Sequence, residues 1–435
     1  MQNLQTVITN KQNVFRDVAK IRNGYAFKKT DFIKSGVPLI RQSNLDGERV
    51  DLSGCVFLSE SYLEKYPNFV LKKGDVLLGM SGSLGKLCYY NLDEPALQNQ
   101  RTGKIDITHP EKVTERYFWY FLNTIESKLI GLSKGTGVNN VSATDIESLG
   151  IYLPALDDQN KITHKLDNYI PKVEASNEKI NKVKKLLRKF RQSVLSAAVT
   201  GKLTEEWRTN KLPQTKNESV EVDNFPFEIP SSWRLLKIED IAEYMGGYAY
   251  KSTTFLKQGT NQVIRIGNVK QLNIFLDYSP VYIPETIAEE TQRFSLQTND
   301  ILLSMTGTKY KRDYGFACIV PELDDKELFL NQRVACLRLK TGIPEYLLYY
   351  FQTDFFRNYL FEGETGNVNQ GNVGSTALRV IPIALPPKEE QEEIVKRIKS
   401  MFETADLVEK QIEIASKRTN KLTQSILAKA FKGEL

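Results

Sequence analysis

Short apolar runs alternate with turn residues over the first 150 residues of this chain. The runs are rich in Val, Ile, Tyr and Phe, and Gly, Asn, Asp and Pro separate them, as at residues 75–80 (DVLLGM) and 85–90 (GKLCYY). This pattern predicts several short strands. A longer, aromatic-rich stretch at residues 116–132 predicts one helix whose aromatic side chains face the core. We therefore expect a mixed, mainly β globule.

The same order of elements occurs again about 220 residues later, and the expected internal helix recurs at residues 345–361. The clearest matches are NGYAFKKTDF (23–32) with GGYAYKSTTF (246–255), LKKGDVLLGMSG (71–82) with LQTNDILLSMTG (296–307), and LQNQR (97–101) with FLNQR (329–333). Solenoid repeats run to about 20–50 residues, so this longer period indicates two whole domains in tandem.

Each globule is followed by a long polar stretch with apolar residues at heptad spacing. The side chains expected in this coiled-coil seam are Leu166, Val173, Ile180, Val183, Leu187, Phe190 and Val194 in the first copy, and Ile398, Met401, Val408, Ile412, Leu422 and Ile426 in the second. A helix of this length is too long for one small globule. We therefore expect the two helices to pair antiparallel, with the globules at opposite ends.

These patterns predict an α+β protein with a pseudo-twofold internal repeat, in which two globules are joined by two long antiparallel coiled-coil helices. The predicted domains are a first globule (1–155), a first long helix (156–203), a linker (204–233), a second globule (234–387) and a second long helix (388–435). The linker is polar and interrupted by prolines, so we expect little structure in it.

Composition limits the classes of function. The chain is 41% hydrophobic and 26% charged, with a formal net charge of +6. No run approaches the roughly 18 apolar residues of a membrane span, and the N-terminus lacks the order of a signal peptide. The four cysteines show no CxxC spacing. We expect a cytosolic protein with reduced thiols and no membrane association, whose mild positive charge is compatible with a polyanionic partner.

Motifs for catalysis are not found in the sequence. Only two histidines, His109 and His164, are present, and neither has a counterpart in the other copy. The stretch at residues 79–86 (GMSGSLGK) is one residue too long for a phosphate-binding loop, and Leu87 stands where Ser or Thr would bind magnesium. These observations favour a binding protein that holds no metal or cofactor of its own.

The ends of the two long helices carry a family resemblance. LLRKFRQSVLSAAVTGKLTEEWR (186–208) and LTQSILAKAFKGEL (422–435), with the GYAFK, NQR and GTG elements, resemble the specificity subunit of type I restriction–modification enzymes, particularly the type IA branch. The resemblance covers residues 14 to 435. The first copy departs from it in lacking the proline–tryptophan entry that the second has at residues 229–233 (IPSSW).

The resemblance implies a sequence-specific DNA-binding subunit without catalytic activity. Each globule would be a target-recognition domain that reads one half of a gapped site in double-stranded DNA, and the helices would set the gap. Two modification subunits, which use S-adenosylmethionine, would dock along the helices. Two restriction subunits, which use ATP and Mg²⁺, would complete the complex.

Comparison of the two copies separates shared residues from variable ones. Residues identical in both copies suit support of the fold or contact with phosphates, and both roles remain open. They are Lys28 and Lys251, Arg41 and Arg265, Asn44 and Asn268, and Arg101 and Arg333 with the Asn-Gln before each. The glycines Gly24 and Gly247, Gly82 and Gly307, and Gly137 and Gly366 are expected to meet backbone requirements.

Loops that differ between the copies are the candidates for base recognition. After the central strand these are Ser81, Ser83 and Lys86 in the first copy, and Thr306, Thr308, Lys309, Tyr310, Lys311 and Arg312 in the second. Arginine is the commonest side chain to pair with guanine, so Arg312 is a candidate, although half of the charges in such loops are only solvated or contact phosphates. The Gly/Asn-rich loops add Asn139, Asn140, Asn367, Asn369 and Gln370, although ordinary turn chemistry explains such residues equally well.

Two other classes of function remain as alternatives. A protein–protein scaffold would also display two globules on a coiled coil, and salt-dependent DNA affinity would distinguish the two. A self-contained restriction–methylation enzyme would need a methyltransferase motif such as NPPY, which the sequence lacks.

Overall fold

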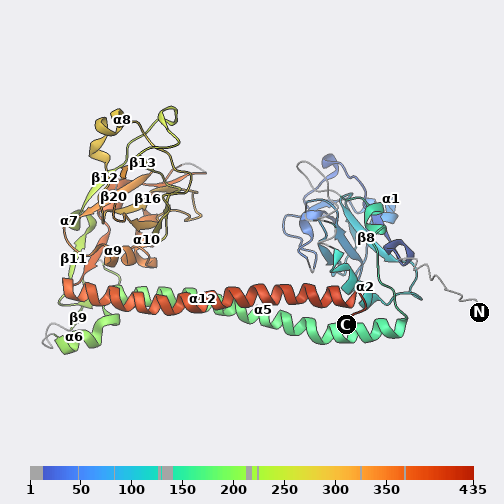
Figure 1. The fold of residues 1–435 in the computed structure, drawn as a ribbon. Helices are drawn as coiled ribbons and strands as arrows, with labels where there is room; N and C mark the ends of the chain where they lie inside the picture. The colour runs from blue at the N-terminus through green and yellow to red at the C-terminus, as the bar shows by residue number, and fades with distance from the viewer. Residues whose placement is uncertain are drawn as a thin grey trace, which may run out of the picture. The chain divides into compact units, whose positions relative to one another are not determined.

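The computed structural model describes residues 13–47, 49–82, 84–125, 129, 141–211, 218–222, 225–323, 326–366 and 369–435. These residues form two compact units. The first combines residues 1–181 with 413–435, and the second comprises residues 182–412. Each unit therefore holds one globule and one part of each long helix, shown in Figure 1 as α5 (Leu156–Val199) and α12 (Lys388–Ala430).

In the first unit, two four-stranded sheets form the globule. The antiparallel sheet has the order β1 (Ala19–Asn23), β8 (Thr102–Ile107), β5 (Val76–Gly79), β6 (Leu87–Tyr89), and the mixed sheet has the order β3 (Val56–Leu58), β2 (Val37–Ile40), β7 (Ala96–Gln98), β4 (Val70–Leu71). The short helices are α1 (Ser61–Lys65), α2 (Glu115–Leu122) and α4 (Ala143–Glu147). Four aromatic side chains of α2 are buried as the sequence predicts, namely Tyr117, Phe118, Tyr120 and Phe121, whereas Trp119 is partly buried. The helix expected at residues 116–132 is shorter than predicted, because α2 ends at Leu122 in a turn where the Thr124 hydroxyl donates to the carbonyl of Phe121.

In the second unit, the same sheet recurs in the same order, with β12 (Ala242–Gly246), β20 (Val334–Leu339), β16 (Ile301–Ser304) and β18 (Ala317–Ile319). The parallel pair β13 (Asn261–Ile264) and β19 (Glu327–Leu330) matches β2 and β7. The remaining pairings are β11 (Arg234–Lys237) with β23 (Pro382–Leu385), β14 (Val269–Lys270) with β15 (Asn273–Ile274), β10 (Ile229–Pro230) with β9 (Ser219–Val220), and β17 (Thr306–Gly307), β22 (Gly371–Val373) and β21 (Glu364–Thr365) in one sheet. The repeat in the sequence is thus a repeat of topology.

The helices of the second globule correct one expectation. The single helix expected at residues 345–361 is two helices, α9 (Pro344–Tyr350) and α10 (Asp354–Glu362). Thr353 separates them because its backbone is extended and its hydroxyl accepts a hydrogen bond from the amide of Phe356, which begins a new helix. The other short helices of this unit are α7 (Ile238–Ile241), α8 (Glu285–Glu290) and α11 (Ser375–Arg379).

The linker is more structured than its sequence suggests. It contains helix α6 (Glu205–Lys211), and Arg208 of this helix is buried against Glu390 in the first turn of α12. The Glu390 carboxylate also accepts hydrogen bonds from the hydroxyl of Thr204 at 2.7 Å and the indole of Trp233 at 2.8 Å. The IPSSW segment noted in the sequence thereby becomes a fixed part of the second unit.

The long helices run antiparallel wherever they meet inside a unit. In the first unit, Ile162 and Leu166 near the start of α5 share a core with Leu427 and Ala430 near the end of α12. In the second unit the end of α5 shares a core with the start of α12, through residues such as Val194, Val199, Ile394 and Ile398. This reversal within both units establishes the antiparallel order.

The seam between the helices is narrower than the heptad pattern predicts. Leu166, Val173, Val194, Ile398 and Ile412 are buried, and Ile180, Leu187 and Ile426 are partly buried. The other expected seam residues, Val183, Phe190, Met401, Val408 and Leu422, are 37% to 50% exposed. The physical reason is that the helices also pack on their globules. Phe402, for example, contacts Tyr349 of α9 with 5.9 Å between ring centroids, so the buried stripe turns toward the globule.

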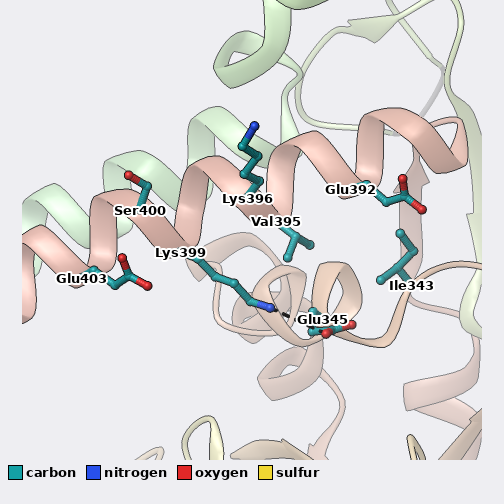
Figure 2. A pocket seen from close by; sticks show the side chains of 8 residues that line it. All are labelled: Ile343, Glu345, Glu392, Val395, Lys396, Lys399, Ser400 and Glu403. Carbon is teal, nitrogen blue, oxygen red and sulfur yellow. Dashed lines mark ion pairs between the residues drawn. The ribbon is translucent and has the colours of Figure 1, made fainter.

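In the second unit, a groove lies where the long helix α12 contacts α9 of the globule. Figure 2 shows the groove between α9 and α12, where Lys399 and Glu345 form an ion pair at 3.7 Å across it. Its lining residues are Ile343, Glu345, Glu392, Val395, Lys396, Lys399, Ser400 and Glu403. None of the residues proposed for DNA contact lines it.

Candidate nucleic-acid interface

Equivalent strand ends bring the shared polar residues together in both units. In the first unit, β5 and β8 pair with Gly79 opposite Thr102, and the amide of Met80 donates to the carbonyl of Arg101 at 3.3 Å. In the second unit, β16 and β20 pair with Ser304 opposite Val334, and the amide of Met305 donates to Arg333 at 3.1 Å. The residue after each methionine, Ser81 or Thr306, therefore lies beside the arginine.

A hollow lined mainly by polar residues, with Phe27 and Phe32 added in the first unit, lies at each of these strand ends. The first, of about 440 Å³, is lined by Phe27, Lys29, Phe32, Arg41, Gln42, Ser43, Ser81, Gly82, Asn99 and Arg101. The second, of about 380 Å³, is lined by Thr306, Gln332, Arg333, Gly366, Gln370 and Asn372. Arg101 and Arg333 are exposed, and neither has a carboxylate partner among the described residues. Such unpaired cations in a polar hollow can contact phosphate or base edges.

The glycine before each exposed tyrosine fixes the Asn-Gln-Arg turn. A Cβ atom on Gly24 would lie 2.3 Å from the carbonyl oxygen of Asn99, and one on Gly247 would lie 2.1 Å from that of Asn331. Both distances are too short for any side chain, which confirms the predicted backbone requirement at these two glycines. The neighbouring Tyr25 and Tyr248 are 39% and 41% exposed.

The shared asparagines Asn44 and Asn268, and the arginines three residues before them, have mainly structural roles. Asn44 is 1% exposed, accepts a hydrogen bond from the amide of Arg41 and donates to the carbonyl of Asp51. Asn268 is equally buried and bonded in the same manner. These two asparagines therefore belong to the fold and not to a DNA surface. The guanidinium groups of Arg41 and Arg265 donate to the backbone carbonyls of Gly54 and Ser279, respectively.

A hydrogen bond within the loop and contacts with α10 hold the loop after β17 in place. The Asp313 carboxylate accepts a hydrogen bond from the amide of Thr308 at 2.7 Å, which lowers the pKa of Asp313. Arg312 donates to the side chain of Asn358 at 3.1 Å and lies 5.2 Å from the ring centroid of Phe361. Arg312 is therefore engaged with α10, and its part in base reading stays a prediction. Lys309 donates to the carbonyl of Gly366, on the rim of the hollow.

The remaining candidates divide by position. Gln370 lines the second hollow, whereas Lys28, Lys86, Lys251, Lys311 and Asn369 are exposed residues outside the two linings. Ser83, Asn139, Asn140 and Asn367, with Gly137, lie outside the described residues.

The structure adds Asn372, which sequence reasoning missed. Its backbone pairs with Thr306, and the Thr306 hydroxyl donates to its side chain at 3.1 Å. The amide of the next residue, Val373, donates to Met305, and Val141 donates to Met80 in the same way in the first unit. The shared Asn-Val of the two Gly/Asn loops (140–141 and 372–373) was the available signal.

Two copies of one globule, each with a polar hollow at the same strand ends, define a two-part binding protein. The family model "Type I restriction modification DNA specificity domain" matches residues 13–185 and 230–416. This chain belongs to that family, and the match falls once on each copy of the repeat.

Curated relatives cover almost the whole chain. The specificity subunit of the type I restriction enzyme EcoBI of Escherichia coli is 31% identical over 96% of this chain and 84% of its own length. That of EcoKI from Escherichia coli strain K12 is 28% identical over 96% and 87%. A solved chain from work on complex assembly and conformational transition of the type I R-M system shares the fold, with a TM-score of 0.64 over 97% of both chains at 17% identity.

Proposed function

We propose that this chain is the DNA-reading subunit of a type I restriction–modification complex, and that each globule reads one half of a two-part site in double-stranded DNA. The observation that carries the proposal is the matched pair of hollows. Each has an exposed arginine beside a hydroxyl residue on the same strand frame, whereas the loops at the rims differ. Strand ends that are the same in both copies suit contact with the regular phosphate backbone. Loops that differ between the copies suit recognition of different bases.

The exposed apolar side chains of the long helices support a second part of the proposal. Those at least 37% exposed are Leu156, Tyr169, Val183, Leu186, Phe190, Met401, Leu407, Val408, Ile414 and Leu422. So many apolar side chains exposed on two helices are typical of a protein-binding surface. We propose that two modification subunits, which bring S-adenosylmethionine, cover this surface, and that two restriction subunits bring ATP and Mg²⁺. The chain itself then supplies recognition, not catalysis.

The test of DNA reading uses Arg101→Gln and Arg333→Gln, one substitution in each hollow. The full chain is expressed with its modification subunits in a host without other methylation, and methylated adenines are mapped across the genome. A two-part motif is expected, with Arg101→Gln relaxing one half only and Arg333→Gln the other. Arg234→Gln, on exposed β11 away from the hollow, is the matched control and should leave the motif unchanged.

Other outcomes of this experiment have definite meanings. Binding that weakens equally at every DNA site would identify the arginine as a phosphate contact. The slope of log binding constant against log salt concentration should then also fall by about one. Absence of any sequence motif with an assembled complex would refute the proposal and favour the scaffold alternative.

The helix surface is tested separately with Leu407→Glu, because Leu407 is 67% exposed. Co-purification of the modification subunit should be lost, since a buried unpaired carboxylate in an interface is unfavourable. Val380→Glu, at a 48% exposed site on the globule, is the control. Co-purification that survives Leu407→Glu would show that the partner binds elsewhere.

A further inference from the structure

The loop between β17 and β18 presents one side chain that the fold does not use. Tyr310 is 78% exposed, the most exposed of the large hydrophobic residues described. Its backbone has φ of 66°, and Arg312 two residues later has φ of 52°. Left-handed backbone at residues other than glycine is strained and persists where the surroundings enforce it.

Contacts with α10 and close packing at Gly307 hold the loop in this conformation. Arg357 of α10 donates to the carbonyl oxygens of Arg312 at 2.9 Å and Gly315 at 3.2 Å. Gly307 lies so close to Asp313 and Tyr314 that a Cβ atom on it would be 2.6 Å from each. The loop is therefore a rigid support that holds Tyr310 exposed at its tip.

The chemistry around Tyr310 suits a polyanion with aromatic rings. Lys309 lies 5.1 Å from the Tyr310 ring centroid, and its ammonium group also reaches the rim of the second hollow at Gly366. Lys311, the residue after Tyr310, is also exposed. Flanking cations can bind phosphates while the aromatic ring stacks on bases.

The first unit has no such side chain among its described residues at this place. Its shorter turn after β5 directs Leu84 inward, where it is 6% exposed and part of the core. At this place the two copies therefore differ in which residue the turn presents: Tyr310 is exposed in the second unit, and Leu84 is buried in the first.

We propose that Tyr310 is a stacking wedge, which enters the base stack of the half-site read by the second domain and gives that half-site a preference for an easily unstacked step. The proposal rests on the proposed function, because it requires that the second domain bind duplex DNA. Pyrimidine–purine steps unstack most readily, so a wedge selects them without a hydrogen bond to a base.

The test uses the full chain with its modification subunits and a pool of random-sequence duplexes. The wild-type complex should enrich a two-part sequence. Tyr310→Ala should keep both half-sites but lose the preference at one step of the second, with affinity lower by roughly 5- to 100-fold, as expected for one lost base–aromatic stack. Tyr310→Phe, which keeps the ring, should retain wild-type preference.

A spectroscopic measurement separates stacking from simple contact. With 2-aminopurine placed at the selected step, the wild-type complex and Tyr310→Phe should change its fluorescence, and Tyr310→Ala should not. Tyr278→Ala, at another exposed tyrosine of this unit that is 60% exposed, is the control and should behave as wild type.

Three results would overturn the inference. Unchanged preference and fluorescence in Tyr310→Ala would exclude a wedge while leaving DNA reading intact. Loss of the modification subunit from Tyr310→Ala, with base preference unchanged, would make Tyr310 a protein contact. A wild-type complex that enriches no sequence would refute both this inference and the proposed function.

Discussion

The Arg208 guanidinium donates to the Glu390 carboxylate in an ion pair whose side chains are 4% and 0% exposed. The pair joins the linker helix α6 to the first turn of α12. Replacing one residue of a buried ion pair is strongly destabilising, because the remaining charge then has neither a partner nor water around it.

Arg208→Ala should therefore destabilise the start of α12 by about 3–5 kcal/mol. Hydrogen exchange followed by mass spectrometry on peptides from residues 388–400 measures this locally. Lys237→Ala removes an exposed pair with Glu239, at 3.8 Å, and should change the free energy of opening by less than about 1 kcal/mol. Similar effects for both variants would mean that the buried pair contributes little.

Gly247→Ala should damage DNA reading by the second domain while the unit stays folded. The added methyl group would lie 2.1 Å from the carbonyl oxygen of Asn331 and must displace the turn that carries Arg333. Methylation mapping should show a weakened or relaxed second half-site and an unchanged first one. Gly374→Ala is the matched control, because nothing lies within 4 Å of its Cβ position. An unaltered motif in Gly247→Ala would show that the turn does not position the DNA contact.

Buried thiols should make stability fall at alkaline pH. Burial raises the pKa of Cys88 and of Cys318 from 9.0 to about 12. Because the folded-state pKa is the higher one, the stabilisation is fully present below pH 9 and is lost as the pH rises toward 12.

Urea unfolding at pH 8 and pH 10.5 should show this loss, and Cys318→Ala should reduce its size. At pH 8, iodoacetamide should leave Cys88 and Cys318 unlabelled in the folded chain, whereas the partly exposed Cys55 should be labelled first. Rapid labelling of Cys318 would contradict the buried position of that thiol.

Lengthening both long helices should change the gap of the DNA site, if the helices set it as we propose. Seven residues inserted after Asn181 and after Ile412 preserve the heptad register and add about 10.5 Å to each helix. The mapped gap should grow by about three base pairs at 3.4 Å each. An insertion in one helix only breaks the register and should abolish methylation. An unchanged gap after the double insertion would refute the role in spacing.

Comparison of the two copies predicted the parts of the site that both copies share. Gly24 and Gly247 were recognised as backbone requirements because both copies keep them, and the same argument placed Arg101 and Arg333 in the site. Contacts between residues distant in sequence could not be read this way. Arg312 seemed free in its loop, but Asn358, which lies 46 residues later, binds it.

Single polar residues explain the other differences between the predicted and the observed structure. Thr353 ends one helix and begins the next through its own hydroxyl, an effect that the strong aromatic periodicity of residues 345–361 conceals. The linker looked unstructured because its order depends on Glu390, which is supplied by the distant helix α12.

The division of the chain into units determines when each can form during synthesis. The first unit includes residues 413–435, and Leu427, Ala430 and Phe431 pack into its core. The core of the first unit can therefore close only after residues 413–435 have been synthesised. Until then the apolar side chains that these residues cover stay open to chaperones and proteases, and deletion of residues 427–431 would damage a globule that lies far earlier in the sequence.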